Sequence, residues 1–228
     1  LGEELPARVR DAVSAPAVRL AAGISDGLPK LVVHRLLQPA LEEPNLRLLC
    51  HEGEMDDLLG DLALHRLDVV LSDRPAPTNP NLKLYSHDLG SSAIAWYGTA
   101  ALVDAAKASF PHSLRDTPVL LPTAHTAVRE QLDHWFERHD LRPRVVGEFE
   151  DSALLKTFGA SGMGLFPATE WVRQDLLSRY GVHRLAPCEG VTERFFAIGT
   201  ERKVRHPLVQ RLLRPPLHDS LAPVTVPL

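Results

Sequence analysis

The chain has 228 residues, of which 44% are hydrophobic and 24% are charged, and its formal net charge at pH 7 is −4. A domain that binds nucleic acid by itself usually carries a basic excess, so this charge argues against DNA binding by this chain unaided. No apolar run approaches the roughly 18 residues of a membrane span, and the first residues lack the apolar core of a signal peptide. We therefore expect no membrane contact and a cytoplasmic location. Cys50 and Cys188 have no metal-like spacing, and we expect packed, reduced thiols.

The first third of the chain alternates predicted strands with predicted helices. Apolar runs predict strands at residues 17–24, 46–50 and 67–73, and leucines at helical spacing predict helices at 28–38 and 55–65. Ser25 or Asp26 is a suitable N-cap for the first helix, and Pro39 and Pro44 are expected to close it. This β-α-β-α-β order favours an open, mostly parallel sheet with right-handed crossovers.

The same pattern repeats in the rest of the chain with different residues. Strands are predicted at 92–98, 119–122, 144–149, 162–167 and 194–200, and helices at 126–139, 150–158, 169–179 and 206–213. Two such units predict two α/β lobes, with residues 1–93 and 198–214 in lobe I and residues 94–197 in lobe II. The start of the chain reads as the end of a helix, and the proline-rich residues 215–228 are expected to form an extended C-terminal tail.

Two facing lobes of this kind predict a ligand cleft. Open α/β sheets bind ligands beyond the carboxyl ends of their strands, where helix N-termini point. The strand-to-helix junctions supply these candidate ligand-binding residues: Ser25, Asp26, Ser72, Asp73, Thr123, His125, Thr126, Glu150 and Pro167. Helix starts at Ser25 and Thr126 favour an anion or a polar oxygen, although both residues also fit the plain role of an N-cap. Glu150 and Asp151 either complement a helix dipole or attract a cation.

The sequence offers no motif for catalysis. It contains no Walker A loop, no H-E-x-x-H, no paired C-x-x-C and no G-x-S-x-G, and GMGLFP is not a dinucleotide fingerprint. We therefore predict no catalytic residue, no metal site and no cofactor. Most of the 11 histidines are expected to be solvated or locally hydrogen-bonded. His125 is the exception of interest, because it lies at a predicted cleft junction.

Three segments in order, LDVVLSD, GASGMGLFP and RHPLVQRLL, resemble the effector domain of LysR-type transcription regulators, and EEPNLRLLCHEG is similar to a pattern of the same family. The resemblance implies two Rossmann-like lobes with mixed, mostly parallel sheets, joined by two crossover strands as in type II periplasmic binding proteins. It further implies a small effector bound between the lobes. The family would bind DNA through a winged helix-turn-helix that is absent from this sequence, and RNA polymerase would be a further partner.

A narrower resemblance concerns NhaR-like regulators of sodium/proton antiporters. VGEFEDSALLKTFGA at residues 146–160 carries it, and ISDGLPKLVVHRLL and ERKVRHPLVQRLL agree. It implies activation of genes for sodium and pH homeostasis, with a small molecule or Na⁺ as the effector. The candidate oxygen ligands for sodium are Asp26, Asp73, Glu150 and Asp151.

The family resemblance also implies a homodimer, which becomes a tetramer when the chain is full length. We expect helices 28–38 and 126–139 to pack antiparallel across a two-fold axis, with Val33, Leu37, Arg129 and Leu132 in the interface. Two alternatives stay open. A solute-binding protein of the periplasmic type would share the architecture and bind a small polar ligand. An enzyme on the same scaffold would need convergent acid, base or nucleophile residues, and the sequence does not supply such a set.

Overall fold

The computed structural model describes residues 16–213, so the predicted N-terminal helix end and the predicted tail lie outside it. The strands are β1 Val18–Ser25, β2 Leu46–Gly53, β3 Val69–Ser72, β4 Leu84–Gly98, β5 Pro118–Pro122, β6 Arg144–Phe149, β7 Phe166–Thr169 and β8 His183–Thr200. The helices are α2 Lys30–Leu41, α3 Met55–Ala63, α4 Ala100–Ala106, α5 Ala127–Arg138, α6 Ser152–Ala160, α7 Arg173–Tyr180 and α8 Pro207–Leu212. Four short 3-10 turns are η1 Lys107–Ser109, η2 His112–Arg115, η3 Glu170–Val172 and η4 Lys203–Arg205.

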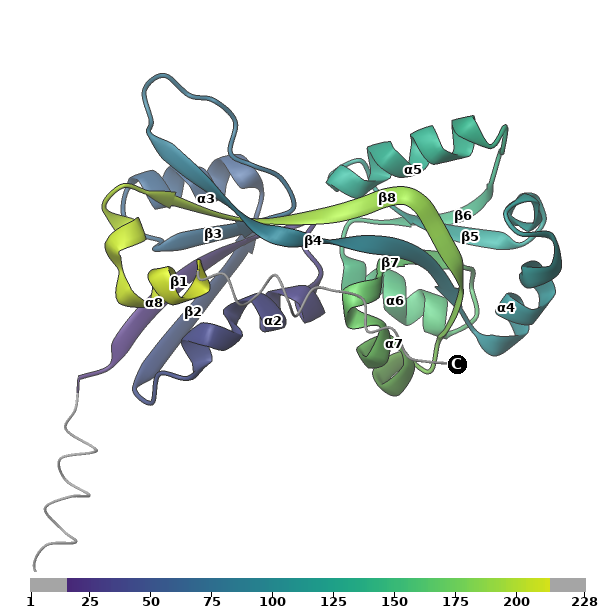
Figure 1. The fold of residues 1–228 in the computed structure, drawn as a ribbon, viewed down its shortest axis with the longest axis horizontal. Coiled ribbons are helices and arrows are strands. Elements are labelled where there is room, and N and C mark those ends of the chain that lie inside the picture. Colours follow the sequence, from purple (N-terminus) through teal and green to yellow (C-terminus); the bar gives the residue numbers. More distant parts are fainter. Residues whose placement is uncertain (1–15, 214–228) are drawn as a thin grey trace, which may run out of the picture.

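Two lobes are joined by the long strands β4 and β8, which cross between them side by side (Figure 1). Lobe I contains β1 to β3 with α2, α3 and α8, and lobe II contains β5 to β7 with α4 to α7. The main sheet has the strand order β2-β1-β3-β8-β4-β7. Strand β1 is parallel to β2 and β3, whereas β8 is antiparallel to both β3 and β4. The sheet is therefore mixed, and its hydrogen bonding continues through both crossover strands.

Strand alternation divides the core of lobe I into two layers. Leu20, Ala22 and Ile24 of β1 pack with apolar residues of α2 and α8. Ala21, between them in sequence, faces the other way and packs with Leu58 of α3. The two layers explain why β1 and β3 are continuous apolar runs, because a strand covered on both faces has no polar side.

Lobe II is built in the same way around the parallel pair β5 and β6. Val119 and Leu121 pack with Trp135 of α5, and Leu120 packs on the other face with Leu155 of α6. A parallel bridge between Val119 and Leu165 brings the segment before β7 alongside β5. Residue Leu165 thus connects the small sheet to the main one.

Several predicted boundaries were wrong, each for a local reason. Ser25 and Asp26 do not cap α2, because a turn in which the Leu28 amide donates to the Ser25 carbonyl precedes the helix, and the N-cap is Pro29. Pro39 lies inside α2, whose last turn continues to Leu41.

Other differences depend on contacts that are distant in sequence. Strands β4 and β8 are 15 and 18 residues long, much longer than the predicted segments, because each pairs with the other across both lobes. Strand β7 is shorter than predicted and begins at Phe166. Helix α4 was not predicted. Cys188 is buried as expected, whereas Cys50 is exposed, and both are free.

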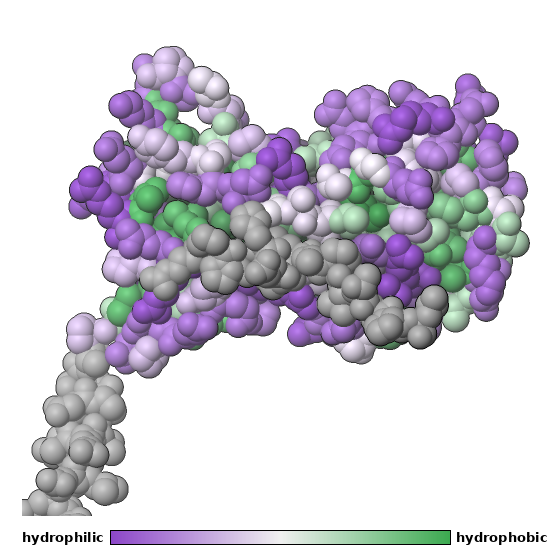
Figure 2. All heavy atoms as spheres, in the orientation of Figure 1, coloured by the Kyte–Doolittle hydropathy of each residue, from purple (hydrophilic) through white to green (hydrophobic). Residues whose placement is uncertain are grey.

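The surface view shows a face that is mostly hydrophilic and that narrows between the lobes (Figure 2). Apolar side chains gather on it only in small areas of each lobe. Among the helices of residues 16–213, none is both long enough and apolar enough to cross a bilayer.

Candidate functional site

A small cavity of about 50 Å³, here called the chamber, lies where the β1–α2 loop of lobe I meets lobe II. Its polar lining consists of Thr126, Ser152, Lys156, Thr169 and Glu193. Its apolar lining consists of Gly27, Pro29, Ile94, Pro122, Val128, Leu155, Pro167 and Ala168. On the same measure a cavity of about 10–15 Å³ holds one water molecule, so the chamber has room for a few water molecules or a small ion.

Two ionisable side chains dominate the chamber. Lys156 of α6 is 3% exposed and Glu193 of β8 is 6% exposed. The Lys156 ammonium donates to Ser152 Oγ at 3.2 Å, whereas the carboxyl oxygens of Glu193 have no hydrogen-bond partner among the described residues. A buried charge without a close partner is costly, so the pKa of each side chain is shifted from its ordinary value.

The pKa shifts of Glu193 and Lys156 bring both groups to titrate in the same pH range. Burial, assisted by the negative charge of Asp73, raises the pKa of Glu193 to about 8. Burial lowers the pKa of Lys156 to about 8, against the attraction of Glu193 and Asp151. Near pH 7 the chamber therefore holds a charged ammonium beside a mostly neutral carboxyl group. Well above pH 8 it holds a neutral amine beside a carboxylate.

Buried hydroxyl groups near the chamber also lack partners. Thr169 lines the chamber, is 2% exposed, and its Oγ1 makes no hydrogen bond among the described residues. The same holds for Ser25 Oγ and Thr123 Oγ1, at the ends of β1 and β5. Buried polar atoms are nearly always hydrogen-bonded. Three exceptions where the lobes meet mark a site suited to a polar ligand or ordered water.

The lobes contact each other directly beside the chamber. The buried carboxylate of Asp73, at the end of β3, accepts a hydrogen bond of 2.9 Å from the Ala127 amide, the first residue of α5. Arg74 donates to the His125 carbonyl oxygen. A β-carbon added to Gly27 would lie 2.9 Å from Asp73 Oδ2 and 3.3 Å from Thr126 Cγ2. The residue at position 27 must therefore be very small for the lobes to approach this closely.

Ion pairs of α2 with lobe II also bridge the lobes. Lys30 of α2 pairs with Asp151 of lobe II at 3.2 Å and with Glu52 at 2.8 Å. Arg35 pairs with Asp175 of α7 at 3.6 Å and lies 5.5 Å above the ring centroid of Trp171. These ion pairs add to the Asp73 and Arg74 contacts that join the two lobes.

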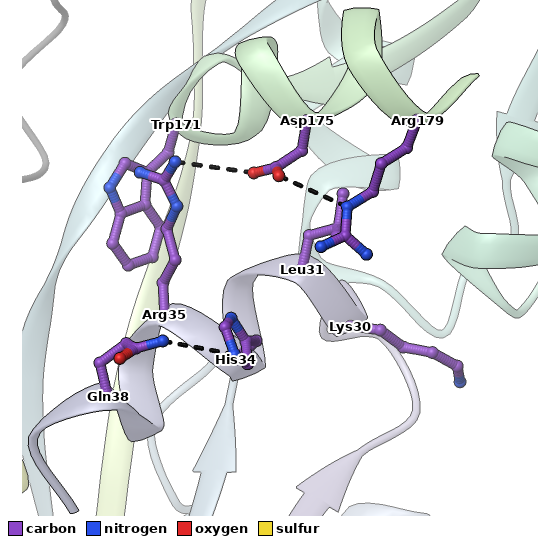
Figure 3. A pocket seen from close by; sticks show the side chains of 8 residues that line it. All are labelled: Lys30, Leu31, His34, Arg35, Gln38, Trp171, Asp175 and Arg179. Carbon is purple, nitrogen blue, oxygen red and sulfur yellow. Dashed lines mark hydrogen bonds and ion pairs between the residues drawn. The ribbon is translucent and has the colours of Figure 1, made fainter. Parts of the chain in front are cut away.

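A second, larger pocket of about 810 Å³, here called the groove, lies between α2 and α7 (Figure 3). It is lined by Lys30, Leu31, His34, Arg35, Gln38, Trp171, Asp175 and Arg179. Asp175 lies between Arg35 and Arg179 and pairs with both at 3.6 Å (Figure 3). Ion pairs as exposed as those of Asp175 are individually weak and sensitive to salt.

The structure brings some of the predicted cleft residues together and separates others. Thr126 and Pro167 line the chamber, and Asp73 contacts α5 beside it. Ser72 and Ser25 are buried at strand ends, and Thr123 begins the turn that leads into α5. These junctions do meet at the lobe boundary.

Four other predicted residues are not among those that line the chamber. Asp26 is exposed. His125 pairs with Glu150 at 3.2 Å on the surface, where both side chains are more than half exposed. Asp151 caps α6 through the amides of Ala153 and Leu154. Within residues 16–213, no three acidic, histidine or cysteine side chains gather as metal ligands would.

The predicted interface residues are less available than expected. Leu37 is 3% exposed and Leu132 is fully buried, each within the core of its own lobe, so neither is an exposed apolar residue seeking a partner. Val33 is half-buried against the lobe I core. The Arg129 guanidinium is held by Asp133, Glu148 and the Pro122 carbonyl.

Sequence analysis missed Lys156 and Glu193, the two charged residues that line the chamber. Lys156 stands in the middle of a helix, in the stretch SALLKTFGA, and Glu193 stands in the strand TERFF. A single charged residue in either place usually marks a solvated face. Only the meeting of β8, α6 and the β1–α2 loop buries them.

Comparison with known proteins gives the family. Residues 15–214 match the family described as the LysR substrate binding domain. This chain belongs to that family. As predicted, it is a LysR-type effector-binding domain.

The chain is also 31% identical over 191 residues to the transcriptional activator protein NhaR of Escherichia coli K12, and equally to NhaR of Shigella flexneri. That match covers 83% of this chain and 62% of the relatives, so the chain spans less than two thirds of their length.

Solved structures confirm the predicted fold class. The reduced regulatory domain of OxyR2 from Vibrio vulnificus superposes with a TM-score of 0.67 and 17% identity, covering 86% of this chain and 93% of that one. The effector-binding domain of QuiR in complex with shikimate superposes with a TM-score of 0.62 and 12% identity, covering 86% and 94%. At such identities the likeness concerns the fold alone.

Proposed function

We propose that this chain is the sensing half of a cytoplasmic LysR-type transcription regulator, which binds an effector between its lobes and catalyses no reaction. The observation that carries the proposal is the chamber, where Lys156, Glu193 and Thr169 are buried without adequate partners at the meeting point of two lobes. The moving bodies would be residues 1–93 with 198–214 and residues 94–197. A ligand that interacts differently with their open and closed arrangements would shift the balance between them.

The similarity to NhaR supports a proposal for the genes that the regulator controls. We infer that the complete protein activates genes for sodium/proton antiporters, with DNA bound by a domain outside this sequence. The net charge of −4 supports this division of labour, because it leaves no basic excess here for phosphates.

Sodium or alkaline pH is the effector that we infer. The chamber is small enough for a single ion, and the carboxyl group of Glu193 and the hydroxyl of Thr169 provide oxygen ligands of the kind hard cations prefer. Asp73 adds a second carboxylate nearby, and the Lys156 ammonium competes for the same oxygens. Above pH 8 the amine of Lys156 is neutral and Glu193 is ionised, which favours a cation. Asp151 and Lys30 are the other charges that act on Lys156.

A small organic effector is the second candidate. QuiR, which has the same fold, binds shikimate. A molecule of that size exceeds the chamber of about 50 Å³, so the lobes would have to separate to admit it.

We also infer a homodimer, with an interface that differs from the predicted one. Val145 and Val146 of β6 and Leu154 and Phe158 of α6 are exposed large apolar residues on consecutive elements. Burial of such an exposed apolar surface against a second copy of the chain is favourable.

Titration with sodium and with potassium at equal ionic strength, at pH 7 and pH 9, tests the effector. We expect sodium to raise the thermal stability more than potassium, and more at pH 9 than at pH 7, because the charge of the chamber is then negative. A Glu193→Gln variant should lose the difference. Equal responses to both ions at both pH values would leave the organic effector as the better explanation.

A further inference from the structure

Arg35 of α2 reaches across the groove from lobe I to lobe II (Figure 3). Its guanidinium carbon lies 5.5 Å from the centroid of the Trp171 ring, and its Nη2 atom lies 3.6 Å from Asp175 Oδ2. A guanidinium is attracted both by the face of an aromatic ring and by a carboxylate. One side chain of lobe I therefore makes two different contacts with lobe II, and neither involves a residue that lines the chamber.

The residues at the two ends of this contact are fixed to different parts of the molecule. Leu36, next to Arg35 in α2, is fully buried in the core. Trp171 is 8% exposed, and its ring packs on Phe195 of β8 with 5.6 Å between the ring centroids. The Trp171 amide also donates to Ser92 Oγ of β4. Arg35 therefore moves with α2, and Trp171 moves with the crossover strands and lobe II, so a rotation of lobe I relative to lobe II would draw the guanidinium away from the ring.

Asp175 of α7 is shared between partners in the two lobes. Its Oδ2 atom pairs with Arg35, and its Oδ1 atom pairs with Arg179 of the same helix, each at 3.6 Å. The pair with Arg179 joins residues i and i+4 of α7, so it does not depend on where lobe I lies. If Arg35 moves away, the Asp175 carboxylate retains a cationic partner in its own helix. The contact across the groove can therefore break without leaving this carboxylate unpaired.

The crossover strands are irregular at the place where β8 leaves the lobe I sheet. Strand β3 pairs with β8 as far as Phe196, and directly beyond it the register of β4 against β8 shifts between Asp88 and Gly90. Gly90 has a φ of 120°, which glycine adopts far more readily than other residues. A β-bulge of this kind bends a strand and increases its local twist. The ladder that joins the lobes is thus interrupted at the edge of lobe I.

We propose that Arg35, Trp171 and Asp175 form a latch that holds the lobes in the arrangement of this structure. When the lobes rotate about the Gly90 bulge, Arg35 leaves the ring and Asp175 passes to Arg179. The latch goes beyond the proposed function, because it acts in the same way whichever effector the chain binds. Exposed ion pairs and exposed cation–π contacts are individually weak, so the latch biases the lobe arrangement and does not lock it.

Pulsed electron paramagnetic resonance between spin labels in the two lobes tests the latch. Cys50 is exposed in lobe I, Glu137→Cys adds an exposed label site in lobe II, and the buried Cys188 escapes labelling. Dilution with unlabelled chain restricts the signal to pairs of labels within one molecule, even where the chain self-associates. The distribution of distances between the labels then reports how much of the protein has its lobes separated.

Removal of either arginine should shift the lobes, and in opposite directions. We expect Arg35→Ala to raise the population of separated lobes by about threefold to tenfold, because both contacts of its guanidinium are lost. Arg179→Ala should lower that population by about twofold, because Asp175 then keeps Arg35 as its arginine partner. Arg66→Ala is the matched control, since it removes an exposed arginine that pairs with Asp61 within lobe I. The side chains of Arg35 and Arg179 are 37% and 63% exposed, so their removal should leave the fold intact.

Tryptophan fluorescence provides a second readout. Trp96 and Trp135 are at most 1% exposed, so quenching by acrylamide reports mainly on Trp171. We expect Arg179→Ala to reduce this quenching below that of the wild type, because Arg35 then covers the Trp171 ring for more of the time. A purely local role of Arg179 within α7 would leave the quenching unchanged.

Neutralising the shared carboxylate completes the test. Asp175→Asn should move both readouts in the direction of Arg35→Ala. Asp104→Asn, which changes an exposed carboxylate paired with Lys107, should match the wild type. Label distances that are the same in Arg35→Ala and in the wild type, or that shift the same way in both arginine variants, would overturn the latch.

Discussion

Lys156 and Glu193 line the same small chamber, and burial moves the pKa of each side chain to about 8. They reach that value from opposite directions, since the ordinary pKa is 10.5 for lysine and 4.5 for glutamate. The charge of the chamber therefore changes sign over a narrow range of pH.

Domain stability is expected to pass through a minimum near pH 8. Between pH 4.5 and about 8 the folded state holds a proton on Glu193 that the unfolded state has lost, so stability falls as pH rises. Between about 8 and 10.5 the unfolded state holds a proton on Lys156 that the folded state has lost, so stability rises with pH. Each slope is at most about 1.4 kcal/mol per pH unit.

Urea denaturation from pH 5 to pH 10 measures this profile. Glu193→Gln should flatten the falling limb and Lys156→Met the rising limb, whereas Asp104→Asn should keep both. A wild-type profile without a minimum between pH 7 and pH 9 would contradict the assignment.

Gly159→Ala is expected to destabilise the fold by about 1–3 kcal/mol. A β-carbon at this position in α6 would lie 2.3 Å from Cδ1 of Phe166, and that ring is fully buried beneath the helix. Gly60→Ala provides the control, because an added β-carbon there meets nothing within 4 Å and alanine favours a helix. The midpoint of urea denaturation distinguishes them, and equal midpoints for the two variants would show that α6 can move away from β7.

Phe158→Ser is expected to weaken self-association with little change in the stability of the monomer. Phe158 is 42% exposed on α6, so its removal costs little burial within the chain. Leu132→Ala should do the reverse, with a loss of about 2–5 kcal/mol, because Leu132 is fully buried in the lobe II core. Sedimentation equilibrium and thermal denaturation separate the two effects. Unchanged association in Phe158→Ser would exclude this face as the dimer interface.

Asp151→Ala is expected to cost roughly 1 kcal/mol. Burial acts to raise the pKa of Asp151, but hydrogen bonds from the Leu154 amide, Lys30 and the Ala153 amide outweigh it and hold the pKa below 3.8. The ionised Asp151 carboxylate therefore stabilises the fold above pH 3.8, and this stabilisation is lost as pH falls further. Denaturation at pH 7 and pH 3 measures it, and a cost that persists in full at the lower pH would argue against the ionised cap.

Sequence patterns located the elements well where local apolar spacing decides them. The strand predicted at 144–149 matches β6 (Arg144–Phe149), and the helix predicted at 126–139 contains α5 (Ala127–Arg138). Strands β4 and β8 extend well beyond their predicted segments, because their outer halves are stabilised by each other and not by local pattern.

The site was harder to predict than the fold. The junction rule placed Asp73 and Thr126 at the lobe boundary, since strand ends of parallel sheets meet there. It gave no sign that Asp73 would itself fill the helix N-terminus. Lys156 and Glu193 are buried only by elements from distant parts of the chain, and no local pattern records that burial.

The return of the chain to lobe I has a consequence for how the protein is made. Leu208, Val209 and Leu212 of α8 complete the apolar layer that covers Leu36 of α2, and they come at the end of the described chain. A ribosome therefore releases all of lobe II before it supplies the last helix of lobe I. During synthesis the apolar face of α2 stays uncovered until α8 is made, while the second lobe can already fold. Chaperone contacts with a nascent chain should therefore concentrate on α2.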